Sequence, residues 1–189
     1  MLKTEKDIIE LIRQDGWMME LLATVRGLNL PDWWICAGFV RSKIWDVLHG
    51  YEEKTVLSDV DVIYFDDKNT DEQEDKYIEA RLKILLPEIP WSVKNQARMH
   101  RRNQVEPYTS AEDAMMKFPE TATALGVRLD RCDNLILSAP HGIDDAISLT
   151  VKPTPFFTAD NQRLAVYRSR MEQKKWKRQW PKISIANLD

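Results

Sequence analysis

Two aspartates, Asp59 and Asp61, stand one residue apart within the apolar segment 57–66, LSDVDVIYFD. Alternate residues of a β-strand point to the same face, so a strand here brings both carboxylates together and turns Val60 and Val62 the other way. Two like charges about 5 Å apart in a partly buried setting repel by roughly 1 to 3 kcal/mol. A divalent cation offsets such repulsion, and Mg²⁺ (or Mn²⁺) typically takes one or two protein carboxylates together with substrate phosphates. The pair therefore predicts a metal site of this kind.

A glycine that ends the preceding apolar run is the second chemical feature. The segment 33–38, WWICAG, is typical of a buried strand that closes on Gly38, and residues 39–50 have apolar side chains at helical spacing and end at Gly50. Glycine allows close approach to the backbone, and the N–H groups of a helix N-terminus bind phosphate. Strand, glycine, helix and Asp-x-Asp together predict a combined phosphate and metal site. An isolated Asp-x-Asp is more often part of a solvated strand face or a turn. This alternative stays open.

The elements that must position these residues alternate along the chain. The apolar spacing predicts one or two helices over residues 5–27, strands over 33–38, 60–65 and 91–99 with helices between them, a hairpin within 121–140 and a basic C-terminal helix over about 160–180. This order favours an α/β or α+β fold with a small mixed β-sheet flanked by helices. We expect a single domain, 1–189, with its core at about 30–158.

Composition excludes several classes of protein. The net charge of −3 argues against a uniformly basic nucleic-acid binder. Cys36 and Cys132 form neither a disulfide framework nor a metal-ligand spacing, which suits a reducing compartment. The charged N-terminal segment is not typical of a signal peptide, and no apolar run reaches the roughly 20 residues of a membrane span. We therefore expect a cytoplasmic protein with no membrane partner.

A resemblance to a known family rests on two blocks of the chain, CAGFVRSKIWDVLHG at 36–50 and LSDVDVIYF at 57–65. Together they resemble the core motif of the DNA polymerase β-like nucleotidyltransferase superfamily, in a form similar to that of the tRNA CCA-adding enzymes. The chain is more similar still, over most of residues 30–158, to a bacterial nucleotidyltransferase-like family of unknown function. The resemblance implies Mg²⁺-dependent transfer of a nucleotidyl group from an NTP to an acceptor that the sequence does not identify.

The resemblance also implies roles for single residues. Asp59 and Asp61 match the two metal-binding catalytic carboxylates. Gly38 matches the second glycine of the turn that holds the triphosphate. Arg41 matches the arginine after that turn, which steadies phosphate or a nearby acid. Ala37 departs from the pattern, because the superfamily usually has its first glycine there.

A third carboxylate is the other departure from the superfamily pattern. Active members place it on an adjacent strand, which here corresponds to the predicted strand 91–99, and the polar face of that strand carries Ser92, Lys94 and Gln96. Either the third acid comes from elsewhere, with Asp144 or Asp145 as candidates, or the protein binds a nucleotide or a protein partner without turnover.

Two cations of the same segment complete the predicted site. Lys94 and Arg98 are positioned on the predicted strand to compensate phosphate charge. Plain solvation at the surface explains the two side chains equally well, and both interpretations stay open.

Basic residues and tryptophans alternate in the C-terminal run 167–182, YRSRMEQKKWKRQWPK. Its centre consists of Lys174, Lys175, Trp176, Lys177 and Arg178. Phosphate contacts and base stacking by such residues hold single-stranded RNA, so an RNA-binding role is a further hypothesis. The alternative is an exposed helix whose tryptophans pack onto the body of the protein.

Overall fold

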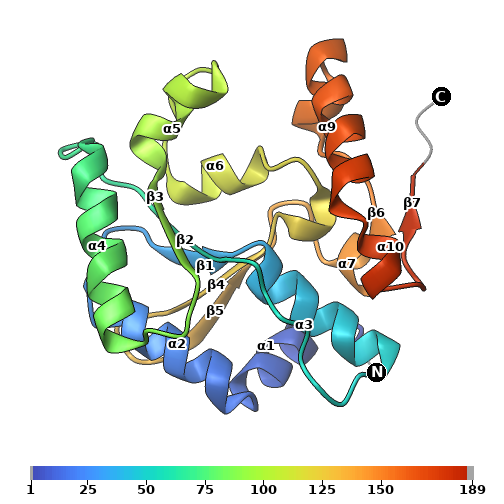
Figure 1. The fold of residues 1–189 in the computed structure, drawn as a ribbon, viewed down its shortest axis with the longest axis horizontal. Helices are drawn as coiled ribbons and strands as arrows, with labels where there is room; N and C mark the ends of the chain where they lie inside the picture. Colours follow the sequence, from blue (N-terminus) through green and yellow to red (C-terminus); the bar gives the residue numbers. More distant parts are fainter. Residues whose placement is uncertain (1, 187–189) are drawn as a thin grey trace.

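A five-stranded mixed β-sheet forms the centre of the computed structural model, which describes residues 2–186 (Figure 1). Its strands are β1 (Trp34–Cys36), β2 (Val60–Tyr64), β3 (Trp91–Asn95), β4 (Gly126–Leu129) and β5 (Leu135–Ser138). They lie in the order β3-β2-β1-β4-β5. β2 and β3 run parallel, whereas the other neighbours are antiparallel. The predicted fold class, a small mixed sheet flanked by helices, is confirmed.

Helices surround this sheet, and a short second sheet pairs β6 (Thr150–Val151) with β7 (Ser184–Ile185) in parallel. The helices are α1 (Glu5–Arg13), α2 (Gly16–Arg26), α3 (Gly38–His49), α4 (Glu72–Leu85), α5 (Gln96–Asn103), α6 (Ala111–Met116), α7 (Asp144–Ile147), α8 (Pro155–Thr158), α9 (Asn161–Lys174) and α10 (Trp176–Gln179), with a 3-10 turn η1 (Thr121–Thr123). In Figure 1, α5 and α9 stand apart with α6 between them. Within residues 2–186, every helix is too short or too polar to cross a bilayer.

Local sequence signals set the limits of several helices. Thr4 and Asp7 form a reciprocal capping box at the start of α1. α3 ends at Gly50, whose φ of 74° is the left-handed conformation that glycine adopts without a Cβ penalty. The Ser110 side chain accepts a hydrogen bond from the Asp113 N–H and so starts α6. These short-range interactions explain why the elements were predictable from residue type and spacing.

The predicted strand 91–99 is wrong in its second half, because β3 ends at Asn95 and residues 96–103 form α5. The Asn95 side-chain oxygen accepts a hydrogen bond from the Ala97 N–H at 3.0 Å and caps the helix. The same oxygen accepts from the Asp66 N–H at 3.1 Å, which ties the end of β3 to the loop after β2. Arg98 therefore lies on a helix and does not continue the polar face of the strand.

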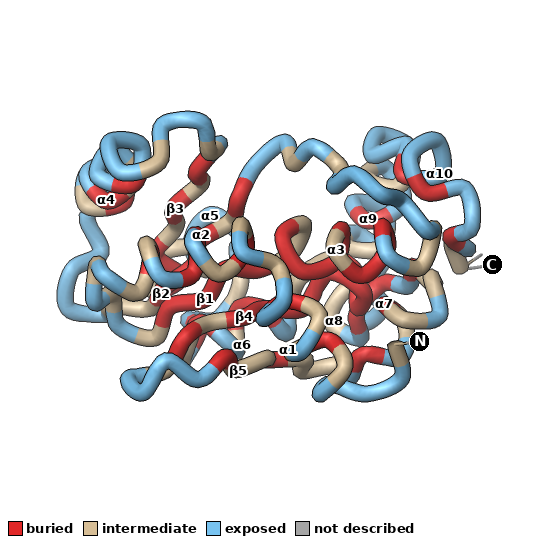
Figure 2. Tube along the Cα trace, turned by 90° about the horizontal axis from the view of Figure 1, so that it is seen from below, coloured by how far each residue is buried: buried red, intermediate tan, exposed pale blue. Residues whose placement is uncertain are grey.

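Burial is densest in the central strands and along α3 (Figure 2). One apolar core includes Ile8 of α1 and also reaches Trp180 and Ile183 near the C-terminal end. Each fully buried large apolar side chain contributes roughly 1.5 to 3 kcal/mol of transfer free energy. The segment after α9 is therefore held by the same core as the sheet.

Candidate active site

A cavity of about 610 Å³ lies beside the start of β2 and is closed on one side by α9 and α10. Five of the six residues predicted for the site line it, namely Gly38, Arg41, Asp59, Asp61 and Lys94. Its volume lies within the range of about 300 to 1,000 Å³ that small-molecule and cofactor sites occupy. The structure thus brings together side chains that are distant in the sequence around one ligand-sized space.

The two aspartates differ in environment. Asp59 precedes β2, is exposed, and accepts a hydrogen bond from the Ser58 hydroxyl at 3.1 Å. Asp61 is half-buried within β2, where its register partners are Cys36 on β1 and Ser92 on β3. Burial, and next the negative charge of Asp59, raise the pKa of Asp61 to about 6, while a hydrogen bond from Ser92 opposes the rise. Ionised Asp61 is therefore under-compensated in the protein alone, which is the condition that a bound cation relieves.

The donor set at Asp59 and Asp61 fits Mg²⁺. Among residues 2–186 no cluster of three or more His, Cys, Asp or Glu side chains has the arrangement of a metal site. Mg²⁺ commonly binds one or two protein carboxylates and completes its octahedron with waters and substrate phosphates. The two carboxylates accordingly suit an ion that arrives with a phosphorylated substrate, rather than a structural ion held by protein ligands alone.

Neither candidate for the third carboxylate reaches this cavity. Asp145 accepts a hydrogen bond from the Thr121 hydroxyl at 2.7 Å and forms an ion pair with Lys152 at 2.8 Å. Asp144 is exposed on α7. Within the described part of the chain, Asp59 and Asp61 are the acids that line the cavity, and Ser92 occupies the register position beside Asp61 on the parallel strand. The suggestion that Asp144 or Asp145 supplies the third acid is therefore wrong.

The turn before α3 keeps a glycine-like conformation without the usual first glycine. Ala37 has a φ of 56°, in the left-handed region that non-glycine residues seldom adopt. Its N–H donates to the Leu125 carbonyl at 3.0 Å, and its carbonyl accepts from the Arg41 N–H at 3.0 Å. A Cβ added at Gly38 would lie 3.7 Å from an Arg41 guanidinium nitrogen. The Gly38 turn therefore lies next to the Arg41 guanidinium.

Three tryptophans surround the Arg41 guanidinium. Its carbon lies 5.0 Å from the ring centroid of Trp45, 4.4 Å from that of Trp176 and 5.2 Å from that of Trp180. One guanidinium nitrogen donates to the Ser42 hydroxyl at 3.1 Å, whereas the buried Nε has no partner. Burial lowers the pKa of Arg41 to about 10, so the group is still cationic at neutral pH. This arrangement fixes a cation in a position where part of its hydrogen-bonding capacity is unused.

The C-terminal tryptophans therefore face inward. Trp176 and Trp180 are buried, and the Trp180 indole N–H donates to the Asp46 carboxylate at 2.7 Å. The prediction that Trp176 is available for base stacking is wrong, because its ring packs against Arg41 and edge-on to Trp45. Lys174, Lys175, Lys177 and Arg178 are exposed, and of these Lys174 lines the cavity. The tryptophans and the basic residues alternate because one side of this C-terminal segment packs against the protein and the other side faces solvent.

Sequence reasoning did not identify Arg170 as a cavity residue. Arg170 lines the cavity four residues before Lys174 on α9, and it forms an ion pair with the fully buried Glu120. Burial, and next the charge of Arg170, lower the pKa of Lys174. An anionic ligand stabilises the charged form of a lysine in such a setting. Their i, i+4 spacing was a visible signal, but the sequence did not show which way α9 faces.

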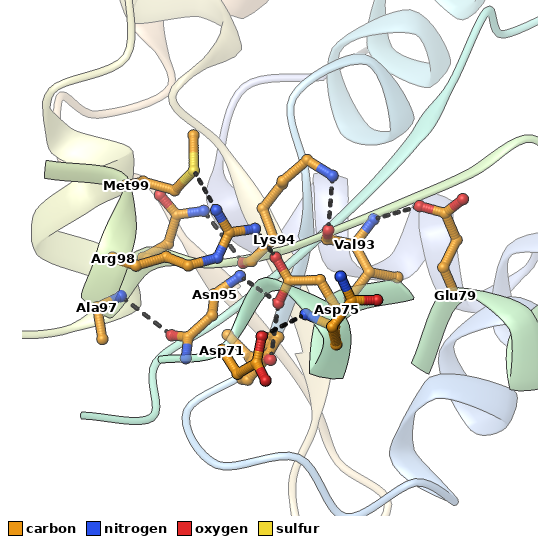
Figure 3. Close-up of polar contacts among 12 residues, drawn as sticks. Asp71, Asp75, Glu79, Val93, Lys94, Asn95, Ala97, Arg98 and Met99 are labelled. Carbon is orange, nitrogen blue, oxygen red and sulfur yellow. Dashed lines mark hydrogen bonds and ion pairs between the residues drawn. The ribbon is translucent and has the colours of Figure 1, made fainter. Parts of the chain in front are cut away.

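Arg98 lies outside this cavity and belongs to a polar cluster between α4 and α5 (Figure 3). It forms an ion pair with Asp75, whose side chain is 2% exposed. Asp75 also accepts hydrogen bonds from the Tyr64 hydroxyl at 2.8 Å and the Asn95 N–H at 3.0 Å. Lys94 in the same view donates to the Val93 carbonyl at 2.9 Å. Arg98 thus compensates a buried carboxylate, and we do not include it among the proposed phosphate contacts.

Replacing Arg98 with methionine is expected to lower the free energy of unfolding by about 3 to 5 kcal/mol, because Asp75 is left as an uncompensated buried charge. Urea denaturation at pH 7.5 measures this, with Arg81→Met on the exposed side of α4 as the matched control. At a temperature where the Arg98→Met variant is folded, its NTP affinity should equal that of the wild type. Weakened NTP binding by the folded variant would contradict the structural role.

Comparison with known proteins assigns this chain to a family. A family model described as nucleotidyltransferase matches residues 23–185. The chain belongs to this nucleotidyltransferase family. The match confirms the superfamily resemblance that the glycine turn and the Asp-x-Asp pair carried. No protein with a curated description matches the chain.

Solved structures of nucleotidyltransferases share the fold. A structure described as revealing a CCA-adding enzyme head domain is 34% identical, with a TM-score of 0.89 over 99% of this chain and 98% of that chain. The Thermotoga maritima CCA-adding enzyme complexed with tRNA is 16% identical, with a TM-score of 0.54 over 98% of this chain and 43% of that one. A CCA-adding enzyme complexed with CTP is 14% identical, with a TM-score of 0.56 over 98% and 44%. At 14 to 16% identity the likeness shows the fold, and this chain spans less than half the length of those enzymes.

Proposed function

We propose that this protein is a nucleotidyltransferase that uses Mg²⁺ (or Mn²⁺) to transfer a nucleotidyl group from an NTP to an acceptor hydroxyl. One observation carries the proposal: a single cavity joins the carboxylates of Asp59 and Asp61 to the glycine turn at Gly38 and to the cations Arg41 and Lys94. Family membership and the likeness to CCA-adding enzymes solved with CTP and with ATP support it.

Charge complementarity supports a triphosphate as the ligand. The cavity is lined by five cationic side chains against two carboxylates, the cations being Arg41, Lys94, Arg102, Arg170 and Lys174. A metal ion at the carboxylate pair increases this excess of positive charge further. Guanidinium and ammonium groups bind phosphate oxygens with charge-assisted hydrogen bonds, which are about twice as strong as neutral ones. We assign Arg41 and Lys94 to the phosphates, with the N-terminus of α3 at Gly38 beside them.

In the proposed reaction, the acceptor hydroxyl oxygen forms a bond to the α-phosphorus and the bond to the bridging oxygen of pyrophosphate breaks. Asp59 and Asp61 would hold the metal, which would neutralise charge on the phosphates. Arg41 is fixed by its tryptophans before substrate arrives, so little reorganisation is needed during the reaction. The hydroxyl proton passes to solvent water. We further propose the cytoplasm as the compartment, since the free thiols of Cys36 and Cys132 suit a reducing environment.

The test is release of pyrophosphate from each of the four NTPs, with water as a surrogate acceptor, by wild type and by Asp59→Asn and Asp61→Asn. Mg²⁺-dependent release by the wild type that both variants lose supports the proposal. Equal background release in all three proteins would sink it.

A second candidate function is nucleotide binding without turnover, and one observation favours it. Ser92 occupies the position beside Asp61 where active relatives are expected to place an acid, and a hydroxyl is not a base at neutral pH. Equilibrium binding of a non-hydrolysable NTP analogue, measured together with pyrophosphate release, distinguishes the two functions. Mg²⁺-dependent binding that Asp61→Asn abolishes, together with no pyrophosphate release, identifies the binding module.

Introducing the missing carboxylate gives a prediction about the same position. We expect Ser92→Asp to raise Mg²⁺-dependent pyrophosphate release at least tenfold, because a positioned general base typically contributes roughly 10² to 10⁴ in rate. Ser92→Asn, which has nearly the same shape and no charge, is the control and should give no increase. Unchanged release by Ser92→Asp at saturating Mg²⁺ would mean that a third carboxylate does not limit the reaction.

A further inference from the structure

A second cavity of about 380 Å³ lies between α5 and α6 on one side and α8 and α9 on the other. Its walls are largely apolar and aromatic, formed by Ala114, Phe118, Pro119, Phe156, Phe157 and Val166. Three cations, Arg102, Lys117 and Arg163, also line it, and within residues 2–186 no acid does. Figure 1 shows the wide separation of α5 and α9, with α6 between them. The combination of aromatic walls and unbalanced positive charge suits an aromatic anion.

This second cavity adjoins the candidate active site. Arg102 of α5 lines both cavities. Along α9, Arg163 and Val166 line the second cavity, and Arg170 and Lys174 line the first. These four positions are separated by three or four residues, so they lie along one side of the helix. The two cavities are therefore successive parts of one groove between α5 and α9.

The three cations of the second cavity are not equally available. Lys117 forms an ion pair with Asp113 at 2.7 Å and lies over the Tyr108 ring. The Arg163 guanidinium carbon is 4.0 Å from the Phe156 ring centroid, and within the described residues neither Arg163 nor Arg102 forms an ion pair with a carboxylate. Arg102 is exposed. Arg102 and Arg163 are accordingly the groups with charge to offer an incoming anion.

We propose that the second cavity is the acceptor subsite and that the acceptor is a small molecule combining an aromatic ring, an anionic group and a hydroxyl. The inference rests on the proposed nucleotidyl transfer. The ring lies among Phe118, Phe156 and Phe157, and the anionic group contacts Arg163 or Arg102. The hydroxyl then faces the first cavity, where its oxygen bonds to the α-phosphorus, pyrophosphate leaves with the electron pair of the broken bond, and the proton passes to water.

Size favours a small molecule over a nucleic-acid strand. A volume of about 380 Å³ lies at the lower end of ligand pockets and holds one ring system with its substituents. The exposed basic residues that a strand would use, Lys175, Lys177 and Arg178, line neither cavity. The basic residues that follow Lys174 are therefore not part of this subsite.

The test uses two fluorescent probes of the same ring framework, the anion 1-anilinonaphthalene-8-sulfonate and its uncharged counterpart N-phenyl-1-naphthylamine. Both are titrated into protein saturated with Mg²⁺ and a non-hydrolysable ATP analogue, so that the first cavity is filled. Val166→Trp fills the second cavity from an exposed position, since Val166 is 59% exposed and the fold does not depend on it. Arg163→Gln removes the cation, and Arg81→Gln on α4 is the matched control outside both cavities.

Wild type and Arg81→Gln should bind both probes. We expect Val166→Trp to weaken both at least tenfold, and Arg163→Gln to weaken the anion at least fivefold while leaving the uncharged probe unchanged. Probe affinities that neither variant alters would overturn the subsite. Displacement of the anion by a 12-nucleotide RNA but not by AMP would overturn the choice of a small molecule. If the ATP analogue itself fails to bind, the proposed function fails, and probe binding by Mg²⁺-loaded protein then tests the subsite separately.

Discussion

Asp61→Asn is expected to abolish Mg²⁺-dependent pyrophosphate release, by roughly a thousandfold or more, and to stabilise the metal-free protein at the same time. The loss of activity follows because one of two metal carboxylates is gone, and a thousandfold corresponds to about 4 kcal/mol of transition-state free energy. The gain in stability follows because Asp61 is half-buried beside Asp59 and carries an under-compensated charge. A residue that costs stability and supports activity marks a functional site rather than a packing position.

The pH dependence of this effect has a definite sign. The folded-state pKa of Asp61 is about 6, above the ordinary 3.8 of an unfolded aspartate. Its contribution to the free energy of unfolding is therefore fully present below pH 3.8 and is lost as the pH rises through 6. At 1.36 kcal/mol per pH unit, the wild type loses about 2 to 3 kcal/mol relative to Asp61→Asn across this interval.

Urea denaturation in EDTA at pH 4.5 and at pH 7.5 measures the difference, with Asp144→Asn, an exposed carboxylate on α7, as the control. The advantage of Asp61→Asn over the wild type should be large at pH 7.5 and smaller at pH 4.5. A variant that is less stable than the wild type at pH 7.5, or that retains full pyrophosphate release, would contradict the assigned role of Asp61.

Arg41→Met is expected to weaken NTP binding by roughly 30-fold, with a change in stability of no more than about 1 kcal/mol. A hydrogen bond from a charged group contributes about 1.5 to 3 kcal/mol, and Arg41 lines the cavity beside the Gly38 turn. Stability changes little because loss of the contacts with three tryptophans is offset by removal of a buried cation.

Titration calorimetry with a non-hydrolysable NTP analogue and urea denaturation together test this prediction. Trp176→Ala serves as the comparison, because truncating a buried aromatic side chain costs about 3 to 5 kcal/mol. That variant should lose stability as well as affinity, whereas Arg41→Met should lose affinity alone. Unchanged NTP affinity in Arg41→Met would show that Arg41 has only a packing role.

Local signals account for what the sequence predicted. Asp59 and Asp61 share a short strand, and Gly38 ends an apolar run before a helix, so residue type and spacing were sufficient to pair them. Capping residues such as Thr4 and Ser110 likewise act within one turn of their helices. Interactions over three or four residues are visible in a sequence because both partners lie in the same window.

The wrong predictions concern features that depend on contacts between residues distant in the sequence. The alternation in 91–99 continued past Asn95, but the side chain of Asn95 bonds to residues of the next helix and of the loop after β2, and so ends the strand. The tryptophans of the C-terminal run have the same spacing whether they face solvent or Arg41. Only the position of α10 against α3 shows that Trp176 faces inward.

Residue type alone showed that the strand next to β2 lacks a third carboxylate, because its polar positions include Ser92 and Lys94 and no acid. The parallel pairing of β2 and β3 adds the register, which places Ser92 beside Asp61 and was not determined by the sequence of either strand alone. Asp145 resembled a candidate by type, but Thr121 and Lys152 already bind it.

A crystal structure of the protein with Mn²⁺ and a non-hydrolysable NTP analogue tests the central claim most directly, because the anomalous scattering of Mn²⁺ locates the metal directly. We predict an anomalous peak within coordination distance of the Asp59 and Asp61 carboxylates, with the triphosphate reaching from that ion towards Gly38 and Arg41. A triphosphate bound elsewhere, or a metal peak away from these two carboxylates, would contradict the account.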